Sequence, residues 1–262
     1  MPEGDVVWWT ARRLREALAG RRLTRAELRV PRYAAVDLRG REVLGVESRG
    51  KHLLIRIEGG VTIHVHLLME GEFRVGPAGA APRGHRVRLV LGNTERTAVG
   101  TSLGMVDVLK TAEEDRVVGH LGPDLLDPAW GPELAAEAVA RLSAGPDRAV
   151  GEAVLDQRLL AGIGNVYKSE LLFLRGVHPR TPVRDVPDLP GLVDLAHRLL
   201  DANKARHGHV TTGDLRRGRT HWVYGRAGQP CRRCGTPVRR ADQSSDAGDR
   251  VTFWCPRCQP EP

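Results

Sequence analysis

The four cysteines of this 262-residue chain constrain its fold more than any other feature. They form two Cys-x-x-Cys pairs, Cys231 with Cys234 and Cys255 with Cys258, with twenty residues between the pairs. This spacing is typical of four thiolate ligands on one zinc ion, and it fits a reducing compartment better than disulfides do. The segment predicts a β-hairpin, with strands at 236–240 and 250–254 and a turn at 243–248. Because the segment is too small to bury its own core, we expect one structural zinc to hold it together.

The chain is basic, with a formal net charge of +8, and most of its cationic side chains are arginine. This balance favours a polyanionic partner, and arginine suits bidentate phosphate contacts, although a solvated basic surface would have the same composition. No apolar run approaches the ~20 residues of a membrane span, and no signal peptide is visible. We therefore expect a cytoplasmic, nucleoid-associated protein without a membrane partner.

Two periodicities divide the chain. Residues 6–19 have apolar side chains at helical spacing, whereas about residues 28 to 110 form short alternating runs punctuated by glycine. The spacing is helical again over 149–204, and a short helix is expected at 132–142 between two proline-rich breaks. The pattern predicts an α+β chain with an N-terminal β-sandwich and a flanking helix. The predicted parts are the sandwich domain in 1–125, a linker in 126–148, a helical domain in 149–228 and a zinc finger in 229–262.

The amino terminus carries the first candidate for chemistry. Removal of Met1 would expose Pro2 as a secondary amine. An α-amino group, with a pKa of about 7.7–8.0, is neutral at pH 7 roughly several hundred times more often than a lysine, with a pKa of about 10.4. Such an amine can attack a sugar C1′ to give an iminium, and Glu3 beside it suits a general acid or base. A frayed terminus is the commoner interpretation, so this one depends on the rest of the chain.

Three further residues have both a functional and a plain structural interpretation. Lys51 begins a strand, where an ordinary strand-edge charge is common. Met69 lies in a tight turn and would by default be a core residue, although it could also form an exposed apolar wedge. Asn165 follows a Gly-x-Gly turn and opens a helix, whose N-terminus favours an anion, but many such turns are purely structural.

Two histidines share one face of a predicted strand. His64 and His66 alternate along the strand 61–67, as two metal ligands would. No third ligand is apparent nearby in the sequence. Packing or a phosphate contact is therefore the favoured interpretation.

Taken in order, the motifs resemble the bacterial formamidopyrimidine-DNA glycosylase / endonuclease VIII family along the whole chain, and its endonuclease VIII branch most. The matching segments are Pro2-Glu3-Gly4, Ser48-Arg49-Gly50-Lys51, His66-Leu67-Leu68-Met69-Glu70-Gly71, residues 155–167, Val223-Tyr224-Gly225-Arg226 and residues 250–259. The resemblance implies that Pro2 is the nucleophile, that Glu3 is the general acid or base, and that Lys51 contacts the lesion sugar-phosphate.

The resemblance also implies residues that bind DNA. Asn165, in a helix–two-turns–helix, and Arg250, in the zinc-finger hairpin, would grip the phosphates beside a flipped nucleotide. Met69 would fill the gap that the flipped base leaves. Pro2, Lys51, Asn165 and Arg250 should then converge on one lesion.

The implied activity is excision of oxidised bases from damaged double-stranded DNA by a monomeric glycosylase with AP lyase activity. The implied route is a Schiff base on the terminal proline followed by β,δ-elimination. The alternative is a non-catalytic protein that binds damaged DNA, or RNA, through a zinc ribbon. Retention of both Pro2 and Glu3 argues against it, since a protein that only binds needs neither.

The sequence departs from the family pattern in three places. Asp5 and Val6 stand where a second Pro-Glu is common. The Arg-Phe wedge pair of a later strand loop has no clear counterpart, and Leu103 is the candidate for that role. Ten residues, Gly213–Trp222, replace the long loop that caps a flipped purine, so we expect oxidised pyrimidines to be preferred over 8-oxoguanine.

Overall fold

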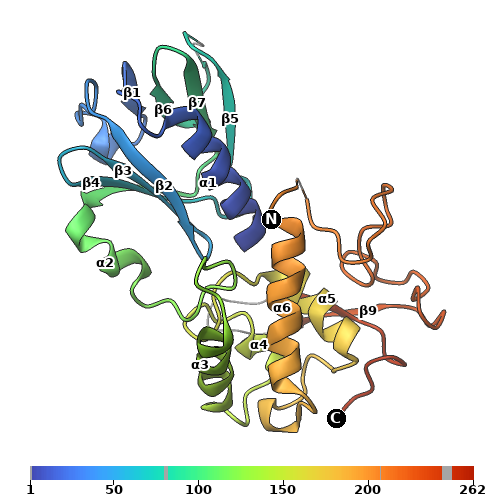
Figure 1. Cartoon of the computed structure of the whole chain (residues 1–262). Coiled ribbons are helices and arrows are strands. Elements are labelled where there is room, and N and C mark those ends of the chain that lie inside the picture. Colours follow the sequence, from blue (N-terminus) through green and yellow to red (C-terminus); the bar gives the residue numbers. More distant parts are fainter. Residues whose placement is uncertain (1, 80–81, 207, 244–249) are drawn as a thin grey trace. The chain divides into compact units, whose positions relative to one another are not determined.

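The structure, a computed structural model, describes residues 2–79, 82–206, 208–243 and 250–262. They fall into two units, Met1–His120 and Leu121–Pro262 (Figure 1). Each unit has its own core and is described by itself. Within the described ranges, no helix is both long and apolar enough to cross a membrane.

Unit 1 begins with helix α1 (Gly4–Leu18), which confirms the predicted helix. Its apolar stripe, which includes Val7, Leu14 and Leu18, is buried. The helix packs mainly against β2 (Val43–Arg49). Arg15 Nε donates to the Val46 carbonyl at 2.8 Å, and further along, Gly20 N donates to the Val43 carbonyl at 2.9 Å. The helix and the strand therefore run in opposite directions.

Two four-stranded antiparallel sheets make up the rest of this unit, as the predicted β-sandwich requires. The sheet orders are β1-β6-β7-β5 and β2-β3-β4-β8 (Figure 1). Besides β2, the strands are β1 (Arg25–Leu28), β3 (His52–Ile57), β4 (Val61–His66), β5 (Glu72–Pro77), β6 (Val87–Gly92), β7 (Arg96–Thr101) and β8 (Met105–Lys110). Short helical turns, η1 (Pro31–Tyr33), η2 (Thr111–Glu113) and α2 (Asp115–Val118), complete the unit. Apolar strand residues such as Ile55, Ile63 and Val65 are fully buried and form one core with α1.

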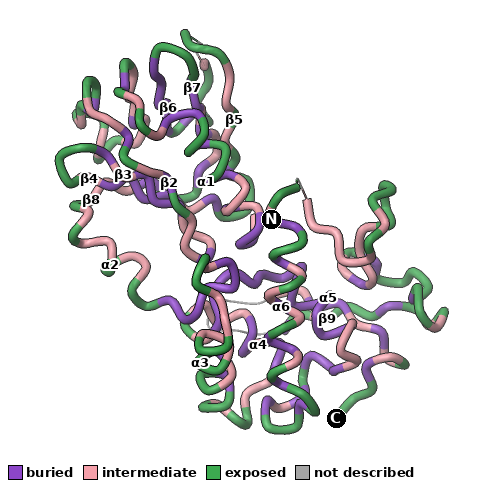
Figure 2. The backbone as a smooth tube through the Cα atoms, viewed as in Figure 1, coloured by how far each residue is buried: buried purple, intermediate pink, exposed green. Residues whose placement is uncertain are grey.

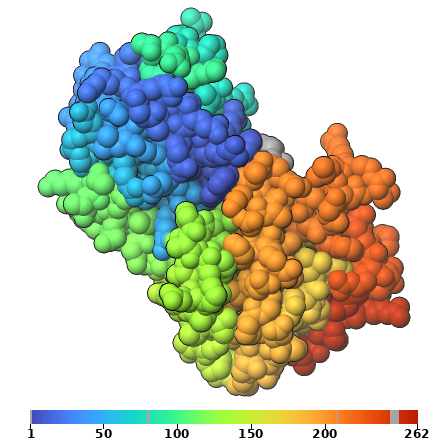
Figure 3. All heavy atoms as spheres, viewed as in Figure 1, coloured from blue at the N-terminus to red at the C-terminus, as the bar shows by residue number. Residues whose placement is uncertain are grey.

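Unit 2 is helical, with a two-stranded ribbon near its end. Its elements are α3 (Pro132–Ser143), α4 (Val150–Ala153), α5 (Asn165–Arg175), η3 (Val183–Asp185), α6 (Leu189–Asn203), β9 (Arg239–Gln243) and β10 (Arg250–Trp254). Helices α3 and α6 lie side by side (Figures 1 and 3). Helix α5 is the central element, because nine consecutive residues from Asn165 to Phe173 are buried (Figure 2).

The predicted elements of this unit agree with the structure in part: of the helical stretch predicted at 149–204, only Val150–Ala153, Asn165–Arg175, Val183–Asp185 and Leu189–Asn203 are helical. Helix α3 confirms the helix expected at 132–142. Strand β10 has the predicted bounds, whereas β9 begins at Arg239, three residues later than predicted. Most of the predicted turn, 244–248, lies outside the described residues.

Candidate functional site

Pro2 and Glu3 are held in place by the start of α1. Glu3 is the N-cap residue and is fully buried, and its carbonyl accepts the Val7 N–H at 3.0 Å. Asp5 is also buried, and its carboxylate accepts the Val6 N–H at 2.8 Å. Pro2, which is half-buried, directly precedes these residues. The described amino terminus is therefore anchored and not frayed, while Met1 lies outside the described residues.

Glu3 and Lys51 lie at the same end of unit 1. Arg15 of α1 is bonded to Val46 of β2, and the two elements run in opposite directions. From Arg15 back to Glu3 the helix spans ~18 Å, at 1.5 Å per residue. From Val46 forward to Lys51 the strand spans ~17 Å, at about 3.3 Å per residue. The amino terminus and the turn after β2 therefore reach the same edge of this unit.

Lys51 lies in the tight turn that joins β2 to β3. Arg49 pairs with His52 across the hairpin, so only Gly50 and Lys51 form the turn. Gly50 has a φ of +55°, a left-handed conformation that glycine adopts without strain. The short turn holds the lysine backbone at this end of the sheet, where β2 and β3 meet.

Met69 is exposed at this same edge and is not a core residue. The strand register aligns His52 with His66, the last residue of β4, and His66 with Met105, the first residue of β8. The turn after β4 therefore lies beside the turn that holds Lys51. Leu68, Met69 and Met105 are 49%, 58% and 45% exposed. These three apolar side chains give the edge an exposed apolar surface.

The prediction that Leu103 is an exposed wedge is wrong. Leu103 is only 4% exposed and belongs to the core of unit 1. A Cβ at Gly100 would lie 2.7 Å from Leu103 and 2.9 Å from Phe73, so both side chains occupy the space that this glycine leaves open. Met105, two residues later, is the exposed apolar side chain of this stretch.

Beside Lys51 lies a histidine cluster that the sequence showed only in part. His52 stacks on His64 with 5.1 Å between ring centroids, and His52 Nδ1 lies 2.8 Å from His64 Nε2. His66 and His120 meet His52 edge-on. Burial, reinforced by the neighbouring histidines and Lys51, lowers the pKa of His52 to about 3 and that of His66 to about 4. His52 and His66 are therefore neutral at pH 7.

In unit 2 the structure brings Asn165 next to Arg250. Asn165 is the first residue of α5, and its Nδ2 donates to the carbonyl of Val251 in β10 at 2.5 Å. Lys168, one turn later and fully buried, donates to the Thr252 hydroxyl at 2.6 Å. Two side chains of α5 therefore hold β10 at Val251 and Thr252, the two residues that follow Arg250. Nδ2 carries two N–H donors, so Asn165 keeps one beyond the bond to Val251.

The two turns before α5 are fixed by side-chain hydrogen bonds. Gln157 Nε2 donates to the Ile163 carbonyl at 2.9 Å, and Gln157 Oε1 accepts the Gly162 N–H at 3.0 Å. Gly162 has a φ of +111°, which a residue with a side chain rarely adopts. Hydrogen bonds from Arg158 hold the pKa of Asp156 well below its ordinary value, so this carboxylate stays ionised within the turns.

The four cysteines form the one group of metal-ligand side chains found among the described residues. Their sulfur atoms all lie within 4.8 Å of one another, and none forms a disulfide. The Cys231–Cys258 and Cys234–Cys255 Sγ distances are 4.0 Å and 3.4 Å. A tetrahedral zinc with bonds of about 2.3 Å needs sulfur atoms about 3.8 Å apart, so the four thiolates fit one zinc.

The electrostatics of the thiols favour a bound cation. Burial raises the pKa of Cys258 to about 12 and raises the pKa of Cys255 above its ordinary value, and the neighbouring thiols add to the effect at Cys258. Four thiols this close cannot all ionise unless a cation compensates their charge. One structural zinc supplies that charge and holds the hairpin to the loop before it.

Three family models together match most of the chain. The formamidopyrimidine-DNA glycosylase N-terminal domain matches residues 1–110, and the formamidopyrimidine-DNA glycosylase H2TH domain matches residues 121–192. The zinc finger found in FPG and IleRS matches residues 228–260.

Curated relatives match over nearly their full length. The "Probable endonuclease 8 2" of Streptomyces coelicolor is 57% identical, covering 100% of this chain and 95% of the relative. The "DNA-(apurinic or apyrimidinic site) lyase Nei2" of Mycolicibacterium smegmatis is 51% identical, with 99% of both chains covered. The formamidopyrimidine-DNA glycosylase of Gluconobacter oxydans is 34% identical, covering 99% of this chain and 100% of the relative.

A solved structure shares the fold. The Lactococcus lactis formamidopyrimidine-DNA glycosylase, bound to DNA that contains an AP site, matches with a TM-score of 0.82 at 23% identity. The match covers 99% of this chain and 100% of that one. With matches in each part of its sequence and in its fold, the chain belongs to the formamidopyrimidine-DNA glycosylase / endonuclease VIII family.

Proposed function

We propose that this protein is a DNA repair glycosylase with AP lyase activity that excises oxidised bases from damaged DNA. The observation that carries the proposal is the anchored Pro2-Glu3 pair at the same end of unit 1 as Lys51. The full-length relatives named endonuclease 8 and AP lyase support the same activity. A cytoplasmic, nucleoid-associated monomer is part of the proposal.

Pro2 is the nucleophile in this proposal. Its secondary amine attacks C1′ of the flipped nucleotide, and the C1′–N bond to the base breaks as the base takes up a proton and the attacking nitrogen loses one. The C1′–O4′ bond then opens, O4′ takes up a proton, and the iminium that remains is the electron sink for β,δ-elimination. Glu3 exchanges a proton with the sugar or the leaving base, since it adjoins the nucleophile. Lys51 contacts the sugar-phosphate of the lesion.

The remaining proposed contacts bind the DNA backbone and fill the space that the flipped base leaves. Asn165 and Arg250 bind phosphates beside the flipped nucleotide. Asn165 is hydrogen-bonded to Val251, the residue after Arg250, and this proximity supports a common role. Met69 fills the space left by the base, which its exposure supports. We further propose that these residues converge with Pro2 and Lys51 on one lesion.

The domain boundaries proposed for these roles are the ones predicted from the sequence. The sandwich domain, 1–125, carries the chemistry, and the linker, 126–148, separates it from the helical domain, 149–228. The zinc finger, 229–262, supplies Arg250.

Oxidised pyrimidines are the proposed preferred substrates. The segment from Gly213 to Trp222 is short, and its ends are fixed, so it offers little chain to fold over a purine. A flipped base needs contacts on its faces and hydrogen bonds at its edge to be held.

Borohydride trapping on abasic-site DNA tests the proposed chemistry. We expect the wild-type protein to be trapped through its amino-terminal peptide, as mass spectrometry of a digest would show. A Pro2→Leu variant should bind the same DNA without being trapped, because a large second residue leaves Met1 in place and residue two without a free amine. Equal trapping by this variant would rule out Pro2 as the nucleophile, whereas no trapping of the wild-type protein would favour the non-catalytic alternative.

A further inference from the structure

The segment that joins the helical domain to the zinc finger, residues 211–222, is tied at both ends to one buried carboxylate. Glu170 of α5 is fully buried and accepts a hydrogen bond from the Thr211 hydroxyl. It also accepts the backbone N–H groups of Trp222 at 2.7 Å and of Val223 and Tyr224 at 2.8 Å. The two ends are therefore fixed relative to α5, and the segment between them forms a closed loop.

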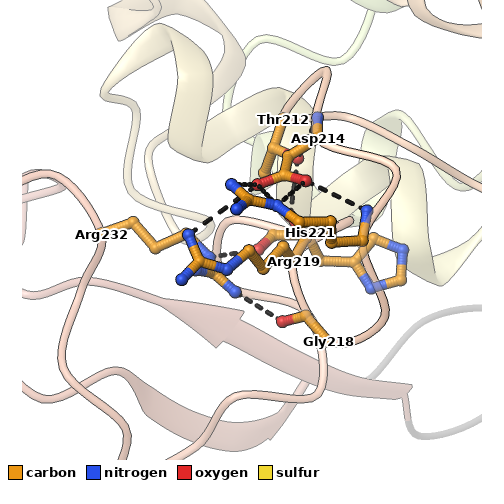
Figure 4. A network of polar contacts seen from close by, with 7 residues as sticks. Thr212, Asp214, Gly218, Arg219, His221 and Arg232 are labelled. Atoms are coloured by element: carbon orange, nitrogen blue, oxygen red, sulfur yellow. Dashed lines mark hydrogen bonds and ion pairs between the residues drawn. The ribbon is translucent and has the colours of Figure 1, made fainter.

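Further hydrogen bonds order the inside of this loop (Figure 4). Asp214 accepts the backbone N–H of Arg216 and a bidentate pair of bonds from its guanidinium. Arg219 Nη1 lies 3.9 Å from the same carboxylate. The Thr212 hydroxyl donates to the Arg219 carbonyl at 2.6 Å and so closes the base of the loop.

One side chain of the zinc finger also holds the loop. Arg232 lies between the first two zinc ligands, and its Nη2 donates to the Gly218 carbonyl at 2.6 Å (Figure 4). Its Nε donates to the His221 carbonyl at 3.0 Å. The planar guanidinium thus joins two points of the loop to the turn that carries Cys231 and Cys234.

The loop presents a basic tip to solvent. Arg216, Arg217 and Arg219 are exposed, and Leu215 between them and Asp214 is 70% exposed. Guanidinium groups on an ordered backbone suit phosphate, and a backbone already fixed loses less entropy when it binds. Nucleic acid is therefore the partner whose chemistry fits this tip.

We propose that Arg232 is a positioning residue that makes the order of loop 211–222 depend on the zinc site, and that this loop contacts DNA through its arginine tip. The DNA contact rests on the proposed function, whereas the dependence on zinc does not. With zinc bound, the turn at Cys231–Cys234 is rigid and Arg232 holds both carbonyls. Without zinc the turn loosens, and the loop loses these two hydrogen bonds while keeping those to Glu170.

Hydrogen exchange of the full-length protein without DNA tests the dependence on zinc. We expect peptides covering 211–221 to exchange about tenfold faster in zinc-loaded Arg232→Gln than in the wild type. The matched control, Arg257→Gln, removes an exposed arginine between the two cysteines of the second Cys-x-x-Cys and should exchange like the wild type. Zinc content is measured for each sample.

Removing zinc from both the wild type and Arg232→Gln distinguishes a positioning role of Arg232 from a general loss of structure. Chelation should speed exchange of this loop strongly in the wild type and only slightly in Arg232→Gln, because the link is already broken there. An unchanged loop in Arg232→Gln, or the same acceleration by chelation in both proteins, would overturn the proposed link.

A second arm tests the contact with DNA. Duplex carrying a stable abasic-site analogue should slow exchange at 213–219 in the wild type. Arg232→Gln should raise KM for lesion-containing duplex about five- to tenfold with kcat within about twofold, because it removes binding common to ground and transition states. Arg257→Gln, which removes the same charge, should raise KM less. No protection of 213–219 by bound DNA would overturn the contact while leaving both the zinc link and the glycosylase activity standing.

Discussion

Lys51 and Lys110 lie at opposite ends of one sheet and form a matched pair for testing a phosphate contact. Lys51 precedes β3 at the edge that holds Met69, whereas Lys110 ends β8 and pairs with Val61 at the far edge. Replacing either lysine by alanine removes one positive charge. Only one of the two positions is at the proposed site.

We expect Lys51→Ala to weaken binding of all lesion duplexes alike and to flatten the dependence of log Kd on log salt by about one unit. Lys110→Ala should change the slope much less. The measurement is fluorescence anisotropy over a salt series, with an abasic-site analogue and a thymine glycol duplex. Loss of binding to only one duplex, or equal slopes for the two variants, would count against the phosphate role.

Single residues were predictable where a motif fixes both type and position. The four cysteines are an example, since their spacing alone defines a ligand set that the structure gathers. The burial of Leu103 is not predictable from the sequence, because an apolar residue in a loop can point towards solvent or towards the core. The space beside Gly100, which Leu103 fills, turns it towards the core. Glu170 gave no signal at all: a glutamate in a helix is usually solvated, and only the folded chain shows its four donors.

Among the elements, the histidine cluster on β3 and β4 gives unit 1 a defined response to pH. The pKa of His52 in the folded protein, about 3, lies below its ordinary value of 6.5, and the pKa of His66 is also lowered. When the pH falls below about 6.5, the unfolded chain takes up protons that the folded rings do not. The stability that these rings contribute is therefore complete above pH 6.5 and is lost as the pH falls towards 3–4.

We expect His52→Gln to lose less stability than the wild type between about pH 7.5 and pH 5, by about 1 kcal/mol after allowing for the partial exposure of the ring. Urea unfolding at the two pH values gives the free energies of unfolding. Glutamine does not titrate but can still bond to His64. Parallel losses in the two proteins would show that His52 titrates normally.

The zinc finger should depend on its metal for its order. We expect one zinc per chain, and we expect Cys255→Ala to lose the metal and with it much of the affinity for DNA, since β10 carries Arg250. Metal analysis and binding to an abasic-site duplex measure the two effects. Full DNA affinity in a zinc-free Cys255→Ala protein would contradict this prediction.

Elements were predictable where one periodicity dominates. The buried stripe of α1 and the alternation in β3 and β4 come from side chains that meet a single core. The start of β9 was placed three residues too early, because Pro237 and Val238 belong to the zinc-finger turns: Pro230 pairs with Pro237, and Val238 bonds back to Gln229. That pairing joins residues on either side of the Cys231–Cys234 turn, and no local pattern in the sequence shows it.

At the scale of the whole molecule, the proposed lesion preference rests on features of each unit, taken separately. Unit 1 offers the Pro2–Lys51 edge with exposed Met69 and Met105, and unit 2 offers Asn165 and Arg250. A flipped base must also be held on its faces and at its edge. In the proposal, Gly213–Trp222 is too short to cover a purine, and its bonds to Glu170 and Arg232, with those inside it to Asp214, limit its reach further.

We therefore expect oxidised pyrimidines to be excised faster than 8-oxoguanine. A pyrimidine presents one ring and needs few contacts from a covering loop, so a short, ordered loop reduces its binding little. A purine has a second ring, which this loop would leave without contacts. The measurement is single-turnover excision of thymine glycol and of 8-oxoguanine opposite cytosine, in one duplex context and in competition. Because both duplexes share every phosphate contact, a difference in rate reports on the base itself. Faster excision of 8-oxoguanine would show that the purine is held by groups other than this loop, and would place the protein with the purine-excising branch of its family.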